Sequence, residues 1–79
     1  MDDAQIKALE EICLIAAERH LKAAVRLEEH CFEREIAAQS DPEELKRLDS
    51  LTHEIYAAWR AASVASAKVL ESLQNARGG

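Results

Sequence analysis

The sequence predicts an all-α protein, an antiparallel two-helix hairpin that dimerises into a four-helix bundle. Three observations predict it. Glycine is absent before residue 78 and proline occurs once, in a chain rich in good helix formers. One cluster of turn residues divides the chain into two similar halves, and apolar residues recur with a helical period in both. The 79 residues, 48% of them hydrophobic, are expected to form one small domain over residues 1–79.

The segment QSDPEEL is the only strong interruption inside the chain. Asp41 is a good N-cap, Pro42 suits the first helical position, and Glu44 can reach back to complete a capping box. Asp3 is expected to cap the first helix in the same way. Two long helices joined by a short turn fold back on each other. The expected bounds are residues 3–38 for the first helix, 39–41 for the turn and 42–76 for the second helix.

Heptad positions a and d on both helices predict where the helices meet, and we call these positions the seam. The first helix supplies Leu9, Cys13, Ala16, His20, Ala23, Leu27, His30, Arg34 and Ala37. The second supplies Leu45, Leu48, Thr52, Ile55, Trp59, Ala62, Ser66, Val69 and Leu73. Antiparallel partners then have numbers that sum to 82, which places Trp59 against Ala23 and brings His30 near Thr52. Large residues face small ones, as close packing requires.

Both helices also carry apolar residues that the seam does not use, and these predict an interface. Alanine alone could sit harmlessly in water because it is a good helix former, but leucine, valine, phenylalanine and isoleucine do not fit that explanation. The surface is expected to bind either a second copy of the chain or another protein, the homodimer being the commoner case. The predicted interface residues are Leu14, Ala17, Leu21, Val25, Phe32, Ile36, Ala58, Ala61 and Ala65.

Charge and composition argue against several partners. The net charge is −5, and no Lys/Arg cluster suited to phosphate is present, so nucleic acid is not an expected partner. No stretch approaches the roughly 20 apolar residues of a membrane span, and the N-terminus does not read as a signal peptide. Cys13 and Cys31 lie too far apart on one helix to bond to each other, which indicates a reduced, cytoplasmic protein.

No pattern indicates catalysis, and the sequence predicts neither an enzyme, a cofactor nor a bound metal. The Glu-x-x-His motif of bundle metal sites is missing at His20, His30 and His53. Acidic neighbours make Cys31 a poor nucleophile. If the first helix packed antiparallel against its twin, Cys13 of one chain would approach Cys31 of the other, and a disulfide between chains is then conceivable. The simpler interpretation treats both as small hydrophobic residues.

These observations favour a small non-enzymatic protein that acts by binding another protein through the surface of a helical bundle. A regulator or antagonist, such as an inhibitor, an immunity protein or an adaptor, is the first expectation. The alternative is a secretion-type chaperone that holds a partner's amphipathic helix on its apolar flank. A metal or thiol site within a helical bundle is the least favoured class.

Overall fold

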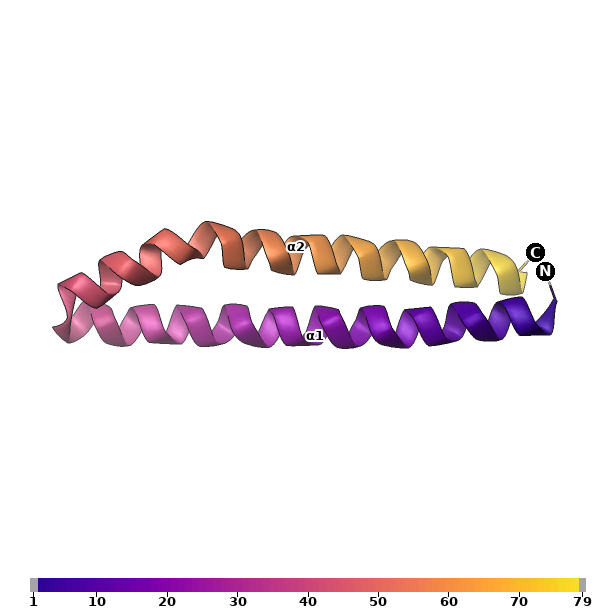
Figure 1. The fold of residues 1–79 in the computed structure, drawn as a ribbon, viewed down its shortest axis with the longest axis horizontal. Coiled ribbons are helices and arrows are strands. Elements are labelled where there is room, and N and C mark those ends of the chain that lie inside the picture. The colour runs from indigo at the N-terminus through magenta and orange to yellow at the C-terminus, as the bar shows by residue number, and fades with distance from the viewer. Residues whose placement is uncertain (1, 79) are drawn as a thin grey trace.

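The computed structural model describes residues 2–78, which form two helices and no strand. Helix α1 spans Asp3–Ser40 and helix α2 spans Pro42–Gly78. The helices run antiparallel side by side, so that the two ends of the chain meet at one end of the molecule (Figure 1). The hairpin measures 58 × 14 × 14 Å. Neither described helix has a run of residues apolar enough, over sufficient length, to cross a lipid bilayer.

The N-terminus of α1 is capped by Asp2, one residue earlier than the Asp3 cap expected from the sequence. The Asp2 carboxylate accepts a hydrogen bond from the backbone N–H of Gln5 at 2.8 Å, and the Gln5 side chain accepts one from the Asp2 N–H at 3.1 Å. This reciprocal pair is a capping box. Asp2 takes the position because a box needs a Glu or Gln three residues later, and Gln5 meets that requirement only from Asp2.

The connection between the helices is shorter than the three residues expected. Helix α1 continues to Ser40, and the Asp41 N–H donates to the Ala37 carbonyl at 2.8 Å, so helical bonding persists to the linker. The Asp41 carboxylate accepts from the Glu44 N–H at 3.1 Å and caps α2, as the sequence predicts. Asp41 therefore terminates one helix and starts the next, which leaves no loop between them.

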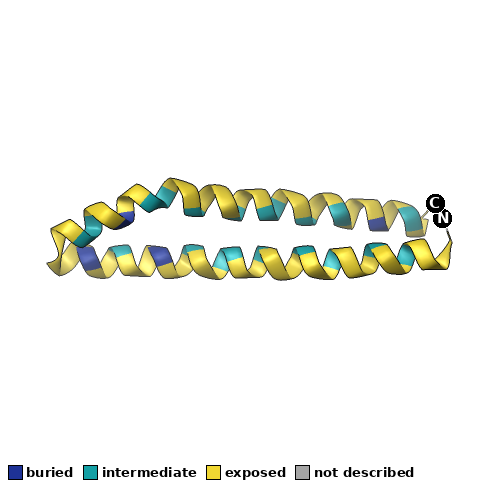
Figure 2. Cartoon of the chain, in the orientation of Figure 1, coloured by how far each residue is buried: buried dark blue, intermediate teal, exposed yellow. Residues whose placement is uncertain are grey.

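The helices contact each other along the predicted seam. All eighteen predicted seam residues lie on the inner faces of the hairpin and none is exposed (Figure 2). Among residues 2–78, full burial is confined to His30, Ala37 and Leu48 near the turn and Leu73 near the open end. Between these two places the seam residues are only half-buried, because many of them are small. The hairpin thus has two short packed regions and a thinly covered middle.

Candidate functional site: exposed apolar side chains along both helices

The most distinctive surface feature is the amount of apolar side chain in contact with solvent. A compact protein of 8.8 kDa exposes about 4,800 Å². This chain exposes 6035 Å², roughly 1,200 Å² more than that. Large apolar residues contribute to the excess, and Leu14, Leu21 and Phe32 are each more than 60% exposed. The others are Ile12, Ile15, Val25, Ile36, Tyr56, Val64 and Leu70.

The hairpin has two long sides, which can be told apart by heptad position. In an antiparallel pair the e positions of both helices flank one side of the seam and the g positions flank the other. Glu10 and Arg77 are both e residues, and their side chains form an ion pair at 3.3 Å across the open end. On the same side Arg34 reaches Asp49 at 2.7 Å near the turn. We call this flank the Glu10–Arg77 side and the other the opposite side.

The predicted interface residues are all exposed in the hairpin, but they do not form one surface. Leu14 and Ala17 lie on the Glu10–Arg77 side, where they line a hollow of about 360 Å³ together with Cys13, Ser66 and Leu70. A separate hollow on the outer face of α2 is lined by residues of that helix alone, Ala61 and Ala65 among them. Ile36 borders a third hollow with Glu44 and Arg47, on the opposite side near the turn.

Five of the large exposed apolar residues are missing from the predicted interface, namely Ile12, Ile15, Tyr56, Val64 and Leu70. Ile12, Ile15 and Tyr56 are each 45–51% exposed. Ile12 occupies a g position and Ile15 a c position, so both belong to the opposite side of the hairpin, whereas Tyr56 occupies an e position on the Glu10–Arg77 side. Assigning every apolar residue a heptad letter would have identified them. The apolar surface therefore surrounds the middle of the hairpin and is not a single flank.

A buried polar layer closes the turn end of the seam. His30 is fully buried, and its Nε2 lies 2.8 Å from the hydroxyl of Thr52, as the seam numbering predicts. The Thr52 hydroxyl donates to the Leu48 carbonyl at 3.3 Å, which assigns the proton of the first bond to His30 Nε2. Such backward bonds from threonine often bend a helix, and α2 is bent in this part of the ribbon (Figure 1). Nδ1 of His30 has no hydrogen-bond partner among the described residues.

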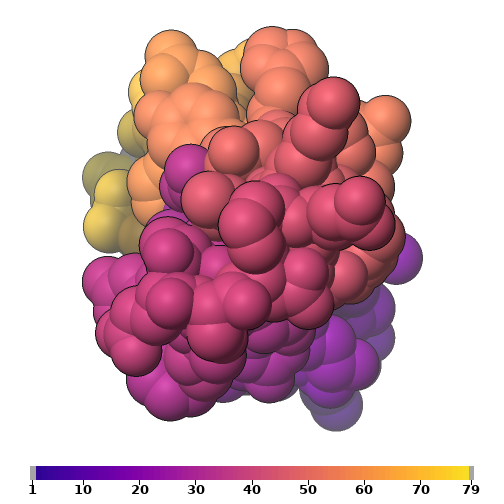
Figure 3. Space-filling model, turned by 90° about the vertical axis from the view of Figure 1, so that its left-hand side faces the viewer, coloured from indigo at the N-terminus to yellow at the C-terminus, as the bar shows by residue number. Residues whose placement is uncertain are grey.

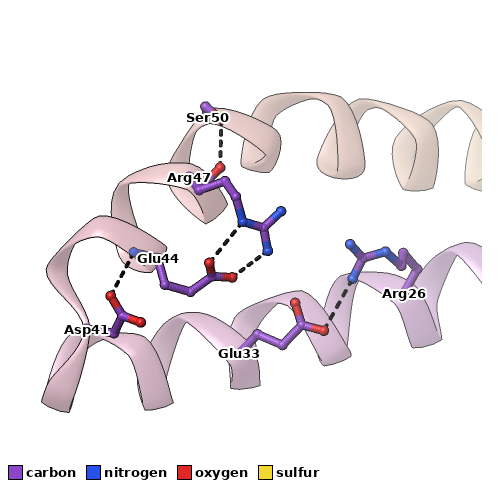
Figure 4. A network of polar contacts seen from close by, with 6 residues as sticks. All are labelled: Arg26, Glu33, Asp41, Glu44, Arg47 and Ser50. Carbon is purple, nitrogen blue, oxygen red and sulfur yellow. Dashed lines mark hydrogen bonds and ion pairs between the residues drawn. The ribbon is translucent and has the colours of Figure 1, made fainter.

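Charged residues near the turn form a short network on the opposite side (Figure 4). The Arg47 guanidinium donates two hydrogen bonds to the Glu44 carboxylate, one of them at 2.9 Å from Nε. These bonds hold the pKa of Glu44 below its ordinary value, and the positive charge of Arg47 acts in the same direction. On α1, Arg26 and Glu33 form a looser pair at 3.9 Å.

Replacing Glu44 with glutamine should give a pH-dependent loss of stability. A carboxyl with a lowered folded-state pKa stabilises the fold above its unfolded pKa, about 4.3, and this contribution disappears as the pH falls through the folded value. Glu44→Gln is therefore expected to melt slightly below wild type at pH 7 and together with it at a pH well below the lowered folded-state pKa of Glu44, where the carboxyl is protonated in both states. Thermal melts at both pH values check this, and an equal difference at both would contradict it.

The histidines, cysteines and carboxylates of residues 2–78 are spread along both helices. No group of three or more His, Cys, Asp or Glu side chains among them is placed to hold a metal ion. Cys13 is half-buried in the seam and Cys31 is exposed on the Glu10–Arg77 side, and neither forms a disulfide. The surface of the hairpin can offer apolar side chains, helix faces and scattered charges to another macromolecule.

Comparison with protein-family models, with curated proteins and with solved structures finds no match to this chain.

Proposed function

We propose that the chain is a non-enzymatic protein-interaction module of the cytoplasm, which associates with itself and regulates or inhibits another protein through the surface of the resulting helical bundle. The observation that carries this proposal is the exposed apolar surface around a hairpin with very few fully buried residues. Exposed patches of this extent mark interaction surfaces in soluble proteins. The two unbonded cysteines are consistent with a reduced compartment.

The part of this surface best suited to a foreign protein is the outer face of α1. Phe32 is 63% exposed there, and Val25, one helical heptad earlier, is 44% exposed. Both occupy f positions, which point away from α2 and away from either flank of the hairpin. An aromatic side chain held on a rigid helix is a typical centre of a protein interface.

Phe32→Glu should abolish binding of the foreign partner while leaving the hairpin folded. Wild type and variant are immobilised, incubated with extract of the source cells, and compared by mass spectrometry. The partner should be retained at least tenfold less by Phe32→Glu, the loss expected of an interface hot spot. Gln39→Glu is the matched control, since it adds the same charge at an exposed residue of α1. Equal retention by all three proteins would contradict the proposal.

The hollow on the Glu10–Arg77 side favours a second candidate, a chaperone that holds a partner's amphipathic helix. Its lining of Cys13, Leu14, Ala17, Ser66 and Leu70 is largely apolar and could take an apolar side chain of such a helix. The oligomeric state separates the candidates. A chaperone of this kind is monomeric when empty, whereas the regulator is self-associated before it meets its target.

A further inference from the structure

We propose that a second copy of this chain covers the Glu10–Arg77 side, related to the first by a two-fold axis parallel to the helices. Each α1 then lies against α2 of the other copy, and the four helices form a bundle in which all neighbours are antiparallel. This dimer is the self-association named in the proposed function, and the inference rests on that part of it. Area, side-chain size and charge support this arrangement.

The area argument comes from the shape of the hairpin. Seen from the turn, the second half of the chain lies above the first (Figure 3), and the hairpin has only α1 and α2 among residues 2–78 to cover its flanks. The excess exposed surface of roughly 1,200 Å² per chain exceeds the ~800 Å² that each partner buries in a standard stable interface. A second copy on one flank therefore accounts for most of the excess, and the outer face of α1 remains available to another protein.

Side-chain size on the Glu10–Arg77 side is self-complementary. The e positions of α1 in the middle of the hairpin hold the small residues Ala17 and Ala24, and those of α2 hold the large residues Tyr56 and Leu70 with the small residue Ser63 between them. Rotation about an axis parallel to the helices leaves every residue at the same level along the bundle. Residue n of α1 therefore meets residues near 82 − n in α2 of the second copy. Ala24 then lies within two residues of the level of Tyr56 of that copy, and Ala17 lies between the levels of its Ser63 and Leu70, so the large side chains of α2 have small residues of α1 beside them.

Charge on this side is divided between the helices. The b positions of α1 near the turn carry the acidic residues Glu28 and Glu35, and those of α2 carry the basic residues Lys46 and Arg60 with the imidazole of His53 between them, all five of them exposed. The same register places Glu35 beside Lys46 of the second copy and Glu28 beside its His53. The two members of each pair differ by one residue in their level along the bundle. Each pair occurs twice in the dimer. Opposite charges at such rim positions commonly determine which helices pair.

The alternative arrangements place like charges together. Packing through the opposite side with the same kind of axis would set Glu29 beside Glu54 of the second copy. A two-fold axis perpendicular to the helices would instead pack α1 against α1 of the second copy. It would bring Arg60 of the two copies together near the middle of the bundle. That last arrangement is also the one that would bring Cys13 of one chain near Cys31 of the other. Like charges in direct opposition weaken association.

The test exchanges the charges of Glu35 and Lys46. The dissociation constant of the dimer is measured for each variant by analytical ultracentrifugation in reducing buffer. Glu35→Lys and Lys46→Glu should each weaken the dimer about tenfold, because each removes two opposite-charge pairs and creates two like-charge pairs. The double variant restores both pairs with their signs exchanged and should return to within about threefold of wild type.

Glu29→Lys is the matched control, since it makes the same change of charge on α1 but on the opposite side. It should leave the dissociation constant within about threefold of wild type. Additive losses in the double variant, or a tighter dimer for Glu29→Lys, would overturn the arrangement. A wild type that stays monomeric would overturn it too, whereas the proposed binding of another protein fails only if Phe32→Glu retains its partner like wild type.

Discussion

Leu48→Ala is expected to lower the free energy of unfolding by roughly 3 kcal/mol, which is enough to leave the hairpin partly unfolded at 37 °C. Leu48 is 1% exposed and is one of the two largest fully buried side chains. Removing three of its carbon atoms loses their transfer free energy and leaves a cavity that two helices cannot easily close. The loss is large for this fold because the buried core is small.

Urea unfolding followed by circular dichroism measures this effect, at one fixed protein concentration because association shifts apparent stability. Val64→Ala is the matched control, since Val64 lies on the outer face of the same helix and is 46% exposed. Its effect should stay within about 1 kcal/mol, because alanine favours helix and little packing is lost. A loss below about 1 kcal/mol for Leu48→Ala would show that the turn end is not a packed core.

The seam could be predicted from the sequence because it depends only on a period and a turn. A heptad repeat of apolar and small residues defines the inner face of each helix, and the position of Asp41 fixes the register between them. The hydrogen bond between His30 and Thr52 follows from that register alone and is present in the structure. Local capping was predictable to within one residue, and the error at Asp3 came from not testing which aspartate has Gln5 three residues later.

The candidate site was harder to predict because exposure does not follow from periodicity alone. The predicted interface joined Leu14 and Leu21 with Ala58, Ala61 and Ala65 as if they shared a face. The structure separates them, because Leu14 borders a hollow on the Glu10–Arg77 side while Ala61 and Ala65 border one on the outer face of α2. Which partner binds each part of the exposed apolar surface also depends on charged residues that become neighbours only when the two helices lie side by side.

If the chain self-associates through the Glu10–Arg77 side, a single charged side chain introduced into that interface should dissociate the dimer. Leu70 is 48% exposed in the hairpin and lines the hollow of that side. Leu70→Glu would place a carboxylate between the levels of Glu10 and Leu14 of the second copy, beside a like charge and an apolar side chain, a change that typically costs several kcal/mol. The dimer is therefore expected to dissociate over the whole micromolar range.

The most direct measurement is the absolute mass of wild type, Leu70→Glu and Val64→Glu by light scattering after size exclusion in reducing buffer. Val64 is 46% exposed, close to the 48% of Leu70, and lies on the same helix but faces away from the proposed interface, so it serves as the control for an added charge. Wild type and Val64→Glu should have twice the chain mass of 8.8 kDa, and Leu70→Glu should have the mass of one chain. A single-chain mass for wild type, or a dimer for Leu70→Glu, would contradict the account.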